Sequence, residues 1–126
     1  MGHKSRIGCL VIDCKTDDLA PATRFWAAAL GCEGRVDDDG KYAVLKTDQG
    51  DPRVLLQAVT HDSRVHLDVE TDDQEAEAQR LETLGAKRVG RHPRWIIMEA
   101  PSGHRFCLVG PQRPDFDTGA TSWDQS

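Results

Sequence analysis

The strongest constraint on the fold is an internal repeat, because the pattern of the first half of the chain returns in the second half. Residues 10–18 (LVIDCKTDD) match residues 65–73 (VHLDVETDD), with the apolar positions aligned and the closing Thr-Asp-Asp identical. Further matches follow in the same order up to residues 53–56 and 105–108. Stable solenoids need at least three repeats, so two copies predict a duplicated module whose halves pack together.

Each copy has the pattern of one strand, one helix and three more strands. The Thr-Asp-Asp triplets at 16–18 and 71–73 supply capping oxygens for a helix start. Gly31 and Gly85 favour the left-handed backbone that ends a helix. Apolar alternation and intervening turn residues predict the strands. These are expected at residues 7–14, 34–36, 41–47 and 53–59, and again at 65–70, 87–91, 95–99 and 105–109.

The two copies predict an α+β fold of two tandem βαβββ modules within a single domain over residues 1–110. Module one spans about residues 6–60 and module two about 64–110. Residues 111–126 are rich in Pro, Asp, Ser and Thr and show little periodicity, so we expect an irregular or disordered tail. Two aromatic side chains are candidates for anchoring this tail on the body: Phe116 and Trp123.

The apolar side chains predict how the helices and strands pack. The first helix carries one apolar stripe that must be buried against a sheet, whereas the stripe of the second helix is weaker and more exposed. In the strand at 65–70, alternation makes one side the seat for a helix and turns the other toward a cavity. The helix side holds Val65, Leu67 and Val69, and the cavity side holds His66, Asp68 and Glu70. The stripe of the first helix is Leu19, Ala22, Phe25, Trp26, Ala29 and Leu30.

Charge and composition exclude several classes of function. The formal net charge is −5 and the basic residues are scattered, which disfavours a nucleic-acid-binding face. No apolar run approaches the roughly 18 residues of a membrane span, and the N-terminal segment lacks a signal-peptide pattern. We therefore expect a cytoplasmic protein with no membrane partner, whose cysteines are free thiols rather than disulfides. The four cysteines are Cys9, Cys14, Cys32 and Cys107.

Several stretches of the chain resemble one known superfamily. They are the Phe-Trp at 25–26, the Leu-Gly at 30–31, the strand at 65–69 and the ending WIIMEAPSGHRFCL at 95–108. Together with the repeat, they make the chain similar to the vicinal oxygen chelate superfamily, specifically to its glyoxalase-like, bleomycin-resistance-related bacterial members. The resemblance implies paired βαβββ modules in an open, curved mixed sheet that encloses a small-molecule cup. It also implies a homodimer.

By the same resemblance, catalytic members hold a divalent metal through His, Gln or Glu on the first and last strand of each module. His66 matches this pattern well, and Gln57 is a weak oxygen donor. The repeat partner of His66 is Val11, which has no donor atom, and Cys107 stands where Glu is usual. We therefore expect no metal and no other cofactor, with His66 as a weak metal candidate. The alternative is an atypical zinc site in which Asp68 or Gln57 joins His66 and Cys107.

The expected function is the binding of a small organic ligand or antibiotic in the cup. One alternative is a metal-dependent lyase, isomerase or dioxygenase with an atypical metal site, and another is a non-catalytic interaction domain. Whether a reaction is catalysed stays open, with His66 and Glu99 as candidate acid–base groups. Their simpler interpretations are a hydrogen-bonded wall histidine and a solvated carboxylate. Asp68 either orients His66 or, like its repeat partner Asp13, ties its strand to the following helix. The candidate ligand-binding residues are Tyr42, Gln57, His66, Asp68, Trp95, Glu99 and Cys107.

Overall fold

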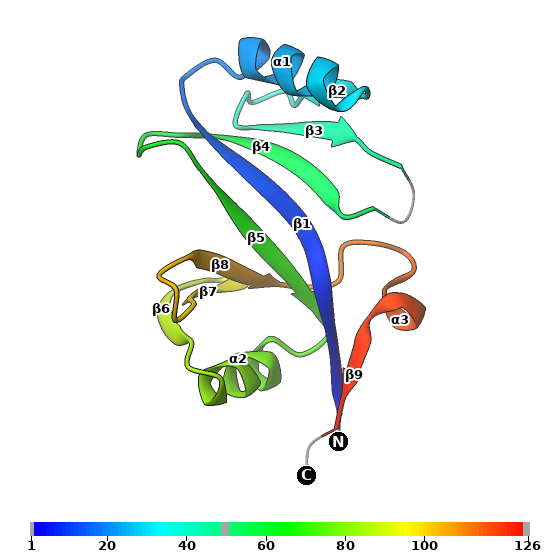
Figure 1. Cartoon of the computed structure of the whole chain (residues 1–126), viewed down its shortest axis with the longest axis vertical. Coiled ribbons are helices and arrows are strands. Elements are labelled where there is room, and N and C mark those ends of the chain that lie inside the picture. The colour runs from blue at the N-terminus through cyan, green and yellow to red at the C-terminus, as the bar shows by residue number, and fades with distance from the viewer. Residues whose placement is uncertain (1, 49–50, 125–126) are drawn as a thin grey trace. The chain divides into compact units, whose positions relative to one another are not determined.

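The computed structural model describes residues 2–48 and 51–124, so the last two residues of the predicted tail lie outside the described part. Two βαβββ modules follow one another along the chain, which confirms the predicted α+β class and element order (Figure 1). None of the helices among the described residues is long and apolar enough to cross a membrane. The elements are β1 (His3–Lys15), α1 (Ala20–Leu30), β2 (Glu33–Val36), β3 (Tyr42–Lys46), β4 (Arg53–Val59), β5 (Arg64–Thr71), α2 (Gln74–Thr83), β6 (Lys87–His92), β7 (Trp95–Glu99), β8 (Arg105–Val109), α3 (Phe116–Gly119) and β9 (Thr121–Trp123).

The chain divides into two compact units, which are described separately. The first unit is Cys9–His66, and the second unit combines Met1–Gly8 with Leu67–Ser126. Each unit contains one βαβββ module, but the N-terminal end of β1 belongs to the second unit. Strands β1 and β5 therefore each contribute residues to both units.

The sheet of the first unit is mixed. Strand β4 pairs in parallel with β1 and antiparallel with β3, and β3 pairs antiparallel with β2. Side chains alternate between the two faces of each strand. Helix α1 covers one of these faces. The buried cluster on that face contains Leu19, Ala43, Leu45, Val54 and Leu56. Among the described residues of the first unit, no helix lies on the other face.

Helix α1 ends at Gly31 as the sequence predicts, but its N-cap is Leu19, which makes no side-chain cap hydrogen bond. The backbone N–H of Ala20 donates to Asp18 Oδ1 at 3.1 Å, and Pro21 occupies the first turn, where a missing N–H costs nothing. Gly31 ends the helix with a φ of 69°, a backbone conformation that glycine adopts without steric strain.

The predicted apolar stripe of α1 is partly wrong. Phe25 is 63% exposed and Leu30 is 51% exposed, whereas Thr23 is buried. A polar residue can occupy this buried position because the Thr23 hydroxyl donates to the Leu19 carbonyl at 2.7 Å and so leaves no unsatisfied donor. The helix is thereby turned toward the side that carries Thr23 and Ala27, and Ala27 packs on the buried cluster.

The sheet of the second unit repeats this plan. Strand β8 pairs in parallel with β5 and antiparallel with β7, which pairs antiparallel with β6. Helix α2 begins at the predicted cap, where the Asp73 side chain accepts the Ala76 N–H at 3.0 Å. Its buried Ala78 packs in the core of this unit. The core cluster is Ala78, Ile96, Met98 and Leu108.

The predicted division of β5 into a helix side and a cavity side is only partly correct. Val69 packs against the α2 cluster, but Val65 is 58% exposed and Leu67 is 36% exposed. The helix therefore covers only the C-terminal end of the strand. Glu70, expected to line a cavity, is fully buried instead.

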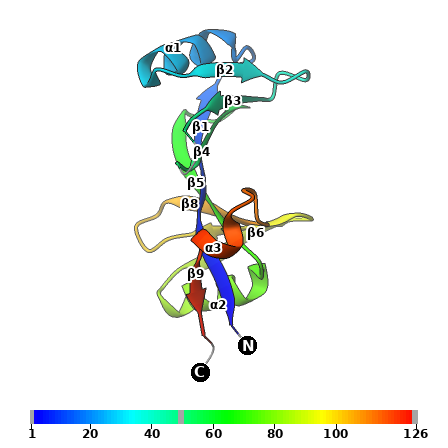
Figure 2. The ribbon, with the colours of Figure 1, turned by 90° about the vertical axis from the view of Figure 1, so that its right-hand side faces the viewer.

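The segment after Gly110 is not irregular as predicted, because it contains α3 and β9. Strand β9 pairs antiparallel with the start of β1, and Figure 2 shows the two strands side by side near the chain ends. The two proposed aromatic anchors explain this order. Phe116 is 4% exposed, and the Trp123 indole N–H donates to the Ser5 hydroxyl at 2.9 Å.

The buried Glu70 carboxylate holds the segment after Gly110 against the rest of the second unit. Arg6 Nε lies 2.5 Å from Glu70 Oε1, and the backbone N–H of Gln112 donates to Glu70 Oε2 at 2.9 Å. Arg113 lies 3.5 Å from the same carboxylate, and Arg6 also reaches Asp115 at 2.7 Å. These charges compensate one another, which a buried carboxylate requires.

A second buried carboxylate joins the chain's N-terminus to α2. His3 Nε2 lies 2.8 Å from Glu77 Oε1, and Arg80 donates to both Glu77 oxygens at 2.8 and 2.9 Å. Glu77 is 1% exposed. Burial raises the pKa of Glu77, but hydrogen bonds from Arg80, His3 and Ser5 outweigh burial and lower the pKa overall.

We expect Glu77 to make stability depend on pH. A carboxyl group whose pKa is lower in the folded than in the unfolded chain stabilises the fold above its unfolded pKa, and this stabilisation is lost as the pH falls through the folded value. In urea titrations from about pH 6 to about pH 3, the free energy of unfolding should fall less steeply for Glu77→Gln than for the unmodified protein. Equal slopes would contradict this assignment.

Candidate functional site

A row of polar side chains crosses the helix-free face of the first unit. In the parallel pairing of β1 and β4, Asp13 lies opposite Gln57, and Val11 lies opposite Leu55. Gln57 in turn lies opposite Tyr42 on β3. Partners in register project from the same face of a sheet, so side chains from three neighbouring strands meet there.

Hydrogen bonds link this row at both ends. The Gln57 amide donates to the Tyr42 hydroxyl at 3.1 Å. His66 Nδ1 lies 2.9 Å from Asp13 Oδ2. We call Tyr42, Gln57, Asp13 and His66 the polar row.

Asp13 is the most deeply buried member of the polar row, with a side-chain exposure of 2%. Two other groups lie near its Oδ2 atom, with Arg64 Nε at 3.6 Å and His61 Nε2 at 4.0 Å. Its second oxygen, Oδ1, is buried and has no hydrogen-bond partner among the described residues. The carboxylate therefore depends on nearby side chains to compensate its burial.

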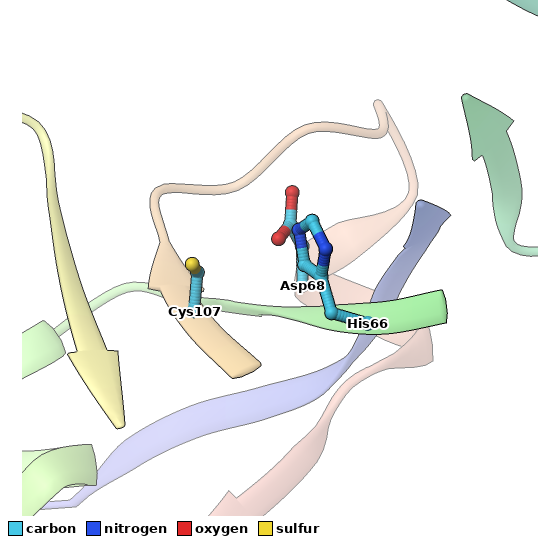
Figure 3. Close-up of side chains that lie close together, drawn as sticks. All are labelled: His66, Asp68 and Cys107. Carbon is cyan, nitrogen blue, oxygen red and sulfur yellow. The ribbon is translucent and has the colours of Figure 1, made fainter. Parts of the chain in front are cut away.

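Three predicted site residues gather on β5 and β8. Asp68 lies opposite Cys107 in the parallel pairing of these strands, and His66 precedes Asp68 on the same side of β5. One ligand atom from each of the three lies within 4.8 Å of the others. Figure 3 shows all three side chains on one side of the two strands. Imidazole nitrogen, carboxylate oxygen and thiolate sulfur are donors that zinc accepts.

Two other predicted site residues, Glu99 and Trp95, each contact a nearby side chain. Glu99 accepts a hydrogen bond from Arg105 Nε at 3.0 Å, with the Glu99 side chain 30% exposed. Trp95 stacks on His92, with ring centroids 3.5 Å apart and planes 3° from parallel. Glu99 is thus half of an ordinary surface ion pair, a weak position for an acid or base.

The sequence interpretation missed the role of Asp13. The repeat aligns Asp13 with Asp68, and the sequence predicts an orienting role toward His66 only for Asp68, with Asp13 expected to tie its strand to the following helix. The structure shows Asp13 in contact with His66, which is distant in sequence. The repeat itself was the sequence signal for this contact, because the strand of His66 is the repeat partner of the strand that carries Asp13. Val11, the repeat partner of His66, is 2% exposed.

A hollow of about 390 Å³ lies in the first unit beside α1, and Asp13 of the polar row is among its lining residues. Ile12, Cys14, Pro21 and Trp26 contribute to its lining. Burial, followed by the nearby charge of Asp13, raises the pKa of the Cys14 thiol. A raised pKa disfavours the reactive thiolate, so Cys14 is not placed as a nucleophile.

Comparisons with solved structures confirm the fold. A hypothetical protein from Bacillus halodurans C-125 matches with a TM-score of 0.60 and 8% identity, over 86% of this chain and 96% of its own. A Mn(II)-bound glyoxalase from Novosphingobium aromaticivorans matches with a TM-score of 0.61 and 20% identity, over 90% of this chain and 42% of its own. A glyoxalase/bleomycin resistance protein/dioxygenase superfamily member from Vibrio splendidus 12B01 gives a TM-score of 0.50 and 18% identity, over 79% of this chain and 97% of its own.

The family assignment comes from the sequence. No curated protein matches this chain. Residues 9–109 match the family described as the glyoxalase-like domain, which covers nearly all of both predicted modules and none of the tail. The predicted resemblance to the vicinal oxygen chelate superfamily is confirmed, and the chain belongs to the glyoxalase-like domain family.

Proposed function

We propose that this protein binds a small organic molecule on the helix-free face of its first unit, without a resident metal. The observation that supports the proposal is the polar row on a face that no helix of this unit covers. Because neighbouring strands lie about 4.8 Å apart, the row from Tyr42 to Asp13 extends roughly 10 Å. That length suits a molecule of one or two rings.

The surroundings of the row match those of ordinary ligand sites. Such sites are mostly apolar, with a few placed polar groups that orient the ligand. Val44 and Leu55 share the face of Tyr42 and Gln57, and Val44 is 42% exposed. Tyr42 adds an aromatic ring that favours flat ligands.

We propose a metal-free site because of the residue types at the expected metal-ligand positions of the first unit. The resemblance puts a metal ligand at the position of Val11, whose isopropyl group has no donor atom. Gln57, the second weak candidate in this unit, offers only a neutral amide oxygen. Trp95 and Glu99 remain predicted ligand contacts. Homodimer formation and a cytoplasmic location also remain predictions from the sequence.

We expect a thermal-shift screen of antibiotics and flat aromatic metabolites to identify a stabilising ligand. Loss of one or two hydrogen bonds and a ring contact should then weaken its affinity about tenfold in Gln57→Ala and in Tyr42→Ala. Phe25→Ala is the matched control, because Phe25 is exposed on α1. Unchanged affinity in both row variants, measured by isothermal titration calorimetry, would place the ligand elsewhere.

A second candidate function is supported by one specific observation. His66, Asp68 and Cys107 bring a nitrogen, an oxygen and a sulfur donor within 4.8 Å of one another. Three protein ligands with one position left for water or substrate are typical of catalytic zinc sites. This arrangement would suit a metal-dependent lyase, isomerase or dioxygenase, the alternative considered from the sequence.

Metal analysis separates the two functions. For protein purified without chelators, the metal-free proposal predicts substoichiometric nickel, zinc, manganese and iron, and no thermal shift when these ions are added. A stoichiometric metal that is lost in His66→Ala and in Cys107→Ser would instead support the metal-dependent function. Asp18→Asn, which alters an exposed carboxylate just before α1, should leave the metal content unchanged in either case.

A further inference from the structure

We propose that the molecule bound on the helix-free face of the first unit is a flat organic acid, whose carboxylate is held by Arg35 and Lys46. The inference rests on the proposed function, because it names the class of molecule that this same face binds. Both cations lie within the first unit, Cys9–His66.

Both cations project from the helix-free face. Gly34 faces α1, since a Cβ added there would lie 2.7 Å from Thr23 Cγ2, so its neighbour Arg35 in β2 points to the opposite side. Leu45 is buried in the cluster under α1, which turns Lys46 away from the helix in the same way. The Arg35 and Lys46 side chains are both exposed.

The strand register places the two cations beside the apolar part of this face. Arg35 lies opposite Val44 on β3, and Val44 lies opposite Leu55 on β4. Lys46 follows Val44 by two residues, so the two side chains share a face and lie roughly 7 Å apart along the strand. Tyr42 of the polar row lies at the same spacing on the other side of Val44. The two cations and the polar row therefore flank the apolar pair.

The fold does not use either cation. In the part of the chain that the structure describes, the side chains of Arg35 and Lys46 make no hydrogen bond and no ion pair within 4.0 Å. A guanidinium group presents two parallel N–H groups that match the two oxygens of a carboxylate, and an ammonium group adds further donors. Arg53 also lies on this face of β4, but it has an interaction of its own and is not counted among the carboxylate contacts.

Acidic side chains near the two cations oppose the binding of an anion. Glu33 lies opposite Lys46 in the pairing of β2 and β3, and Asp48 and Asp51 belong to the turn after β3. None of these three carboxylates lies within 4.0 Å of Arg35 or Lys46, so a bound carboxylate displaces no ion pair. The net charge of −5 also disfavours anions at long range, so their binding must come from local contacts.

The polar row determines which end of the ligand carries the charge. Asp13 lies opposite Gln57 in this row, so a carboxylate placed there would meet another carboxylate. A ligand hydroxyl can instead donate to the side-chain carbonyl of Gln57. The arrangement therefore suits a molecule with a hydroxyl at one end, a carboxylate at the other end, and a flat apolar body over Val44 and Leu55.

Isothermal titration calorimetry with a matched pair of probes tests the inference. One probe is a hydroxynaphthoate whose hydroxyl and carboxylate lie at opposite ends of the ring system, and the other is its neutral carboxamide. We expect the carboxylate to bind about tenfold more tightly than the carboxamide, because it gains charge-assisted hydrogen bonds. Equal affinities overturn the inference, and so does a carboxylate that fails to bind.

Charge-removing variants test whether the two cations hold the carboxylate. Arg35→Gln and Lys46→Gln should each weaken carboxylate binding about fivefold and leave carboxamide binding unchanged. Glu33→Gln should strengthen carboxylate binding, because it removes the cross-strand repulsion. Arg24→Gln is the matched control, since it removes the same charge from an exposed position on α1 and should change neither affinity. An equal loss in the control overturns the inference, because the effect is then one of net charge.

The carboxamide separates failure of this inference from failure of the proposed function. If both probes bind equally well and shift the amide signals of Val44 and Leu55, the face binds small molecules without selecting acids, and only the inference fails. If the carboxylate binds but shifts signals elsewhere in the chain, the inference fails, and the independent ligand screen decides the proposed function. Signals of β2 and β3 that shift with protein concentration in the absence of ligand indicate a second copy on this face, which also overturns the inference.

Discussion

Parallel pairing between β1 and β4 determines which side chains meet in the first unit. With Asp13 opposite Gln57, alternate residues of both strands (Ile12, Cys14, Val54 and Leu56) lie under α1, and Asp13 and Gln57 lie together on the opposite face. A shift of either strand by one residue would exchange its two faces and bury the Asp13 carboxylate or the Gln57 amide beneath the helix. The core and the proposed binding surface are therefore consequences of one register.

Much of the fold could be predicted because its signals are local. Strand alternation, the Asp73 cap and the glycine at the end of α1 each depend on a few consecutive residues. The repeat then supplied the order of the elements. The error at Phe25 arose because helical periodicity defines an apolar stripe but not its rotation against the sheet. The internal hydrogen bond of Thr23 let a polar residue occupy the buried side.

Contacts between distant residues could not be predicted in the same way. Glu70 and Glu77 are charged side chains that a sequence pattern assigns to the surface, yet both are buried. Arg6 and Arg113 compensate Glu70 from remote segments, and the remote His3 joins the neighbouring Arg80 at Glu77. The same limit applies to the candidate site. The sequence named Tyr42, Gln57, His66, Asp68 and Cys107, but the hydrogen bond from His66 to Asp13 requires knowing which strands come together. Residue types can be read from the sequence, but which distant residues contact one another cannot.

The most direct test of the proposed binding surface is chemical-shift mapping with the best ligand from the screen, using ¹⁵N-labelled protein. Binding on the helix-free face of the first unit predicts the largest changes at Tyr42, Val44, Leu55 and Gln57, with α1 unaffected. Changes confined to the hollow beside α1, around Ala22 and Trp26, would contradict the account. Changes restricted to the second unit would contradict it equally.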